Sequence, residues 1–156
     1  MHVAYIDSSV ALRAALPSNQ CDAWRDWMTA TKNDAPIVST RHLKTEMIRM
    51  LRRDRIDLLE ADKVLSRIRM LPVTPATFVD AEQIRPTIKT LDALHLASAK
   101  FFGSQVGVDL TLLTHDQTMR SVAELIGLRT GDPVGPDNTP QAVEWTASLE
   151  QPANTK

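Results

Sequence analysis

The chain has 156 residues, of which 43% are hydrophobic and 24% charged, so it is long enough to form one compact domain with its own core. Its net charge of −1 excludes a globally basic coat protein but not a local basic patch, and its single cysteine, Cys21, excludes an intrachain disulfide and argues against a cysteine-based zinc site. Because the sequence has neither an apolar run of about 20 residues nor an N-terminal signal segment, we expect a cytoplasmic protein.

The first half of the chain predicts strands that alternate with helices. Residues 3–6 form a short apolar run that stops at Asp7, as a buried parallel strand does before a turn. Trp24, Trp27 and Met28 have the spacing of an amphipathic helix, which we expect over 21–31. We further expect a helix over 10–16, a strand over 36–39, a helix over 42–53 that begins after Ser39 or Thr40, and a helix over 58–68.

The second half continues this alternation. After an apolar break at 70–73 we expect helices over 77–84, over 90–102 closed by Gly103, and over 115–126 closed by Gly127, with a strand over 110–113. These elements predict an α/β fold in which helices flank a central, mainly parallel sheet. After Gly131 the sequence becomes turn-rich and polar. We therefore expect a domain over 1–131 and a Pro-rich, partly flexible extension over 132–156, with a loosely docked helix over 141–149 and a frayed end over 151–156.

Four acidic residues lie where a carboxylate is locally unusual: Asp7, Glu46, Asp92 and Asp116. Asp7 and Asp116 follow predicted strands, which is where α/β proteins place their binding sites. Asp92 lies in the first turn of an apolar helix, and Glu46 lies on the flank of the apolar stripe of its own helix. Each residue alone also has a simpler explanation, which is a turn or helix cap for the aspartates and a solvated helix face for Glu46.

The simpler explanations weaken when the four residues are taken together. We expect the strands and helices to bring the carboxylates to one edge of the sheet, where each pair would repel by about 3 kcal/mol at about 5 Å. A divalent cation offsets such repulsion, and ligation by oxygen alone favours Mg²⁺ or Mn²⁺ over zinc. Metal sites of this kind bind phosphates and activate water for attack on phosphorus.

The order and surroundings of these acids resemble the PIN-domain family and, more closely, the VapC toxins of bacterial toxin–antitoxin pairs. The segments that carry the resemblance are Ile6-Asp7-Ser8-Ser9, Thr45-Glu46, Leu91-Asp92-Ala93-Leu94-His95-Leu96-Ala97 and Leu113-Thr114-His115-Asp116. The resemblance runs over residues 1–130, and its most specific motif is 91–97. The Pro-rich continuation to Lys156 departs from the family pattern.

The resemblance implies a three-layer α/β sandwich and a Mg²⁺- or Mn²⁺-dependent endoribonuclease. Asp7, Glu46, Asp92 and Asp116 match the acidic quartet that holds the metal and positions the attacking water, and Thr114 matches the hydroxyl residue before the fourth acid. The resemblance also implies an RNA substrate, a homodimer and a cognate antitoxin that covers the acidic groove. The alternative is a PIN-like protein-interaction module that has lost catalysis.

Several residues near the acids have open interpretations. Ser8 or Ser9 either orients Asp7 or contacts phosphate, or both serines only cap the following helix. Arg49 and Arg53 lie in the densest basic run and either hold RNA phosphates or form a solvated helix face. His95, inside an apolar helix, is interpreted as a hydrogen-bonded core histidine rather than a metal ligand.

Overall fold

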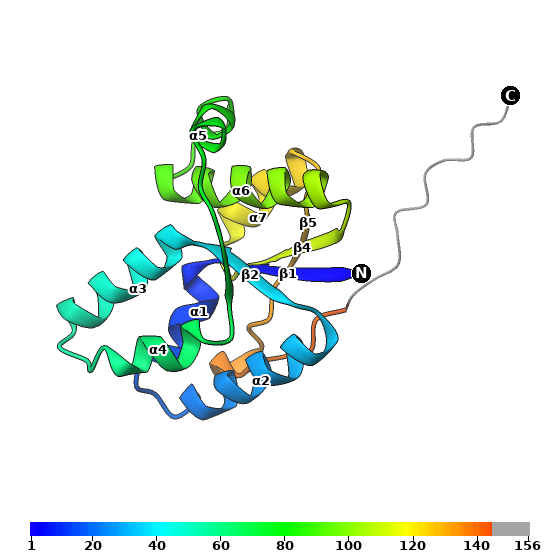
Figure 1. Cartoon of the computed structure of the whole chain (residues 1–156). Helices are drawn as coiled ribbons and strands as arrows, with labels where there is room; N and C mark the ends of the chain where they lie inside the picture. Colours follow the sequence, from blue (N-terminus) through cyan, green and yellow to red (C-terminus); the bar gives the residue numbers. More distant parts are fainter. Residues whose placement is uncertain (145–156) are drawn as a thin grey trace, which may run out of the picture.

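The computed structural model describes residues 1–144 and contains a five-stranded parallel sheet (Figure 1). The strands are β1 (His2–Ile6), β2 (Ile37–Thr40), β3 (Arg69–Leu71), β4 (Asp109–Leu113) and β5 (Arg129–Gly131). Their order in the sheet is β3-β2-β1-β4-β5. The first strand of the chain therefore lies in the middle of the sheet and pairs with β2 on one side and with β4 on the other.

Helices cover both faces of this sheet. Within residues 1–144 they are α1 (Ser8–Ala15), α2 (Cys21–Asp34), α3 (Arg41–Arg53), α4 (Leu59–Leu65), α5 (Pro75–Glu82), α6 (Thr90–Val106) and α7 (Gln117–Leu125), with a short 3₁₀ helix at Pro136–Asn138. Ala4 and Ile6 of β1 pack with α1–α4, whereas Val3 and Tyr5 pack with α6 and α7. Because side chains alternate between the faces of a strand, β1 is buried on both sides, and the predicted α/β sandwich is confirmed.

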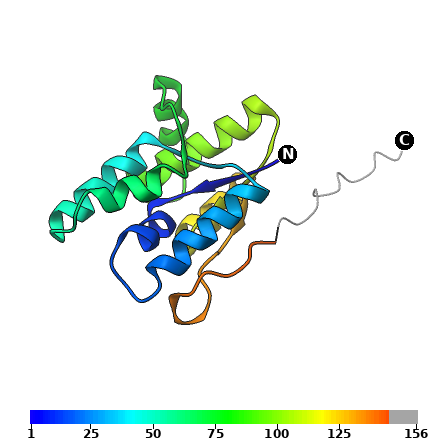
Figure 2. The same cartoon turned by 60° about the horizontal axis from the view of Figure 1, so that its bottom comes forward.

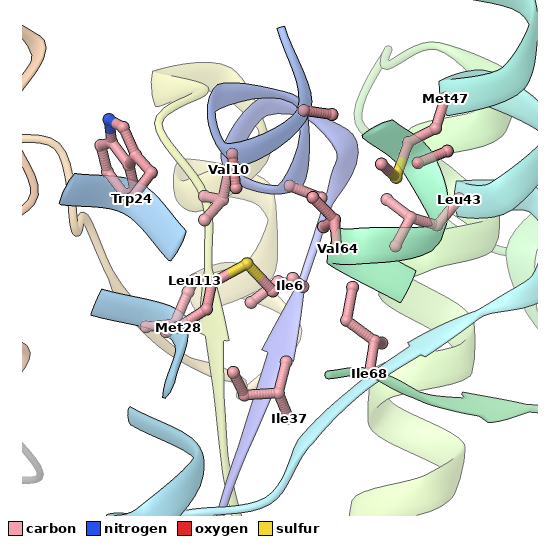
Figure 3. Packing of buried hydrophobic residues seen from close by; sticks show 14 of the residues in the cluster. Ile6, Val10, Trp24, Met28, Ile37, Leu43, Met47, Val64, Ile68 and Leu113 are labelled. Carbon is pink, nitrogen blue, oxygen red and sulfur yellow. The ribbon is translucent and has the colours of Figure 1, made fainter. Parts of the chain in front are cut away.

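The core on the α1–α4 face holds the start of α1 against the sheet. Figure 3 shows Val10 of α1 and Met28 of α2 around Ile6 of β1 and Leu113 of β4, with Val64 of α4 beside them. All of these side chains are buried, and each contributes about 1.5–3 kcal/mol through the hydrophobic effect. This packing keeps the residues that follow β1 at the edge where β4 also ends.

Some element boundaries differ from those predicted. The expected apolar break contains β3, whose three residues are too few to show a strand period. The helix expected to close at Gly103 continues as α6 to Val106 and closes at Gly107, whose φ of 64° is the left-handed conformation that glycine adopts without strain. Gly103 lies inside α6 instead, where an added Cβ atom would make an ordinary contact, 3.5 Å from the Cβ of Leu110.

The segment after β5 packs against α2 (Figure 2). The indole N–H groups of Trp24 and Trp27 donate to the carbonyl oxygens of Asn138 at 2.9 Å and Gln141 at 3.2 Å, and Val134 is buried in the core. The division of the chain at residue 131 stays a prediction. Residues 141–144 are not helical, and the rest of the helix expected over 141–149, like the frayed end over 151–156, lies outside the described residues. Over residues 1–144, no helix combines the length and apolar character that crossing a bilayer requires.

Candidate active site

The candidate site lies at the carboxyl ends of β1 and β4, where the strand order of the sheet changes direction. Ile6 and Leu113, the last residues of these strands, are register partners, so the segments that follow them leave the sheet side by side. In open parallel sheets, the crevice at such a change of direction is where ligands bind. The fold therefore brings Asp7 and Asp116, far apart in the sequence, to the position that was expected for them.

Asp7 is 4% exposed and is held by three donors. The Thr114 hydroxyl donates to Oδ2 at 2.6 Å, while the Ser9 hydroxyl at 2.7 Å and the Val10 N–H at 3.3 Å donate to Oδ1. Burial raises the pKa of Asp7 above its usual value even though these hydrogen bonds favour the charged form. Asp7 is therefore both the N-cap of α1 and a desolvated acid, and Ser9 rather than Ser8 is the serine that orients it.

Thr114 connects two of the acids. Its side chain is fully buried, and its Oγ1 both donates to Asp7 and accepts the backbone N–H of Asp116 at 3.1 Å. Oδ1 of Asp116 accepts the N–H of Met119 at 2.9 Å and so caps α7, as the simpler explanation predicted. Thr114 thus fixes the spacing between a buried carboxylate and a half-buried one.

Glu46 reaches the site from α3, and both of its carboxylate oxygens have partners. The Ser8 hydroxyl donates to Oε2 at 2.9 Å, and Nε2 of His95 lies 3.1 Å from Oε1. The other ring nitrogen of His95, Nδ1, lies 2.8 Å from the Tyr5 hydroxyl. Burial alone would raise the pKa of Glu46, but the hydrogen bonds from His95 and Ser8 bring it below its usual value. Glu46 is therefore an oriented carboxylate, and His95 is the buried, hydrogen-bonded histidine that was expected.

Asp92 lies in the first turn of α6 and is half-buried. Its pKa is raised first by burial and then by the negative charges of Asp116, Asp7 and Glu46. Within residues 1–144 its side chain has neither a hydrogen bond nor an ion pair. The four predicted acids therefore form one electrostatically coupled cluster, and one member of it lacks any donor.

A cavity of about 470 Å³ opens next to Glu46. Arg49 and Arg53, the two arginines predicted near this acid, line it together with His42 and Leu91. Arg53 also donates to Asp54 at 2.8 Å, and both partners of this ion pair are exposed. The cavity therefore joins an oriented carboxylate to two exposed guanidinium groups.

Comparison with known proteins assigns a family to this arrangement. A family model described as PIN domain matches residues 4–125, a range that contains Asp7, Glu46, Asp92 and Asp116. The chain belongs to the PIN domain family.

Two curated relatives, both from Mycobacterium tuberculosis, are similar to this PIN domain over nearly their whole length. Ribonuclease VapC46 is 30% identical over 131 residues, which cover 82% of this chain and 95% of the relative. Ribonuclease VapC47 is 28% identical over 134 residues, which cover 83% of this chain and 96% of the relative.

Two solved structures share the fold of this PIN domain. A chain in the crystal structure of VapBC2 from Rickettsia felis, bound to a DNA fragment from its promoter, superposes with a TM-score of 0.62 at 12% identity and covers 85% of this chain and 98% of its own. PAE2754 from Pyrobaculum aerophilum superposes with a TM-score of 0.52 at 18% identity and covers 83% and 92%. At these identities the likeness shows the fold.

The donor atoms of the acidic cluster in this PIN domain fit a hard divalent cation. They are carboxylate oxygens. Burial raises the pKa of Asp7, and burial together with the negative charges of the neighbouring acids raises the pKa of Asp92. A positive charge placed among them would relieve that repulsion and supply the partner that Asp92 lacks.

A second group of ligand atoms lies beside the acidic cluster. One atom each of His42, Glu46 and His95 lies within 4.8 Å of the others. Burial and the neighbouring His95 lower the pKa of His42 to about 4, so its ring is uncharged at neutral pH. The sequence reasoning missed His42, and the signal that was available is its separation of four residues from Glu46 on a predicted helix, which puts both side chains on one face.

Proposed function

We propose that this PIN domain is a metal-dependent endoribonuclease toxin of the VapC type. The observation that carries the proposal is Asp92, a half-buried carboxylate without a donor among three further acids at the ends of β1 and β4. The names of the two curated relatives, which are ribonucleases, support RNA as the substrate.

The residues of the cluster have different roles in this proposal. Asp7, Asp92 and Asp116 would hold Mg²⁺ or Mn²⁺, which when bound acidifies water and stabilises negative charge on a scissile phosphate. Thr114 orients Asp7 and Asp116, and Ser8 and His95 orient Glu46. Because the pKa of Glu46 is lowered, this carboxylate is ionised at neutral pH and able to accept a hydrogen bond from the attacking water.

Removal of divalent metal is expected to abolish cleavage. The purified full-length chain, incubated with RNA, should produce internal cuts in Mg²⁺ or Mn²⁺, none after chelation, and the same cuts when metal is restored. Metal should also raise the unfolding temperature, because it binds the folded state alone. Cuts that persist in chelator would contradict the metal-dependent mechanism, and a folded protein that binds metal but cuts no RNA would favour the inactive interaction module.

Arg49 is expected to hold RNA phosphate. It is exposed and lines the cavity beside Glu46, whereas Arg53 is partly engaged by Asp54. Replacing Arg49 with Ala should raise KM several-fold and reduce the slope of log affinity against log salt by about 1, with little change in kcat. Arg85→Ala is the matched control, since this exposed arginine lines a different cavity. If the slope of log affinity against log salt is the same in Arg49→Ala and in the wild type, Arg49 does not bind phosphate and belongs to a solvated helix face.

The proposal includes a cognate antitoxin that covers the acidic groove, a homodimeric state and action in the cytoplasm. The likeness in fold to a chain in the structure described as VapBC2 supports the antitoxin. Induced expression of this chain without an antitoxin should arrest growth, and co-expression of the antitoxin should restore it. Growth that is unaffected in a host whose RNA the purified protein cuts would refute the toxin part of the proposal.

A further inference from the structure

We propose that His42, Glu46 and His95 form a binding site for a borderline transition-metal dication such as Zn²⁺, separate from the three aspartates. His95 also orients Glu46, but within residues 1–144 His42 hydrogen-bonds to none of the four acids, and Asp7, Asp92 and Asp116 do not belong to this group of ligand atoms. Two imidazoles and one carboxylate are a donor set that suits zinc, whereas Mg²⁺ prefers oxygen alone.

The spacing of the donor atoms matches a single small ion. Two ligands bound to one tetrahedral zinc at about 2.0–2.1 Å lie about 3.3 Å apart. Nε2 of His95 and Oε1 of Glu46 are 3.1 Å apart, and the third donor, from His42, lies within 4.8 Å of both. The His42 and His95 rings are already close, with centroids 4.0 Å apart. Nδ1 of His42 lies 2.7 Å from Oγ1 of Thr40, so a rotation of the His42 side chain that exchanges this contact for the ion would complete the set.

A zinc-bound histidine needs a hydrogen-bond partner at the ring nitrogen that does not bind the metal, and the surroundings of His95 provide one. Nδ1 lies 2.8 Å from the Tyr5 hydroxyl, which in turn lies 3.4 Å from Oγ1 of Thr40. When the ring proton moves from Nε2 to Nδ1, Nδ1–H donates to Tyr5 and the Tyr5 hydroxyl donates to Thr40. Nε2 is then a bare ligand atom in a ring whose orientation is fixed, as second-shell hydrogen bonds fix it in known zinc sites.

Access and the remaining coordination position come from the cavity beside α3. His42 and Glu46 both line this space of about 470 Å³, so a hydrated ion reaches them from solvent and water occupies the fourth position. Arg49 and Arg53 line the same space but are exposed, where water and salt screen their charges.

Occupation of this site would regulate the ribonuclease, a consequence that rests on the proposed function. A zinc ion bound to Glu46 withdraws this carboxylate from the attacking water and leaves the aspartates in place. Zinc would therefore inhibit RNA cleavage without displacing Mg²⁺ from them.

The binding step is tested by titrating Zn²⁺ into the full-length chain in excess Mg²⁺. We expect one zinc per chain, binding at least about tenfold weaker in His42→Gln, and unchanged binding in His115→Gln. His115 is the matched control, because it is 46% exposed, pairs with Asp132 and lies outside the group. Equal zinc affinity in the wild type and His42→Gln would overturn the proposal and assign the ion to the aspartates. Absence of zinc binding would also overturn the proposal.

Two further measurements complement the titration, and the first of them needs neither a variant nor enzymatic activity. In the NMR spectrum of the wild type, zinc should shift the ring signals of His42 and His95 but not that of His115, and the reverse pattern would refute the site.

With RNA and Mg²⁺ present, zinc should inhibit the wild type and His115→Gln but spare His42→Gln. Inhibition of all three proteins alike would refute the regulatory step. Absence of cleavage before zinc is added would instead count against the proposed function, while the zinc titration still decides the site.

Discussion

Asp92→Asn is expected to lower metal-dependent RNA cleavage by about a hundredfold or more while the fold stays intact. Asp92 is half-buried, has no hydrogen-bond or ion-pair partner within residues 1–144, and lies in the field of Asp7, Glu46 and Asp116. The amide keeps the shape of the side chain but removes the negative charge that a cation requires. The measurement is the rate of cleavage at saturating Mg²⁺, together with the rise in unfolding temperature that Mg²⁺ causes, which should shrink in the variant.

The metal-free variant is expected to be at least as stable as the wild type. The folded state raises the pKa of Asp92, so its ionised form destabilises the fold at neutral pH. Wild-type stability should therefore increase as the pH falls through that raised pKa, and Asp92→Asn should lack this part of the increase. Asp80→Asn, at an exposed position of α5 outside the acidic cluster, is the control that should leave cleavage unchanged. Full cleavage by folded Asp92→Asn would exclude Asp92 from the metal site.

Thr114→Val is expected to lower the free energy of unfolding by about 2–3 kcal/mol. Valine has nearly the same shape, but it leaves Oδ2 of buried Asp7 without its 2.6 Å donor and the N–H of Asp116 without its acceptor. A charge-assisted hydrogen bond is among the stronger ones, and an unpaired buried group keeps its full desolvation cost. Denaturant unfolding of the metal-free protein measures the effect, and cleavage should fall because Asp7 loses its shortest hydrogen bond and the backbone at Asp116 loses its acceptor.

Thr114→Ser separates the hydroxyl from the methyl group. Serine keeps both hydrogen bonds and removes one buried methyl, which costs about 0.8 kcal/mol, so it should retain most of the activity. Destabilisation by Thr114→Ser with none by Thr114→Val would mean that packing of the methyl group, rather than the bond to Asp7, is what Thr114 provides.

The sequence predicts most of the scaffold because its signals are local. Apolar runs that stop at an aspartate locate β1 and β4, and helical periodicity locates α2 and α3. The positions of Asp7 and Asp116 follow from the rule that parallel strands end at one edge of a sheet. By contrast, β3 has three residues, and its place in the sheet depends on pairing with β2 rather than on a pattern of its own.

The hydrogen-bond partners inside the site could not be predicted from local sequence patterns. In the sequence Tyr5 has the pattern of an ordinary strand residue, and the residue that its hydroxyl contacts, His95, lies 90 residues further along the chain. Ser8 and Ser9 are adjacent, yet the turn into α1 aims one at Glu46 and the other at Asp7, a difference that depends on the rotation of the helix. Such contacts follow from tertiary packing, and no spacing in the sequence encodes them.

The position of β1 in the middle of the sheet has a consequence for biosynthesis. Its final residue, Ile6, pairs with Leu113, so the edge that carries Asp7 and Asp116 is assembled from the first and the last parts of the PIN domain. A ribosome that adds about 5–20 residues per second exposes the first acid several seconds before the last one. The nascent chain is therefore without a complete acidic cluster until nearly the whole domain has emerged. Translation that stops before residue 116 therefore releases a fragment without the complete acidic cluster.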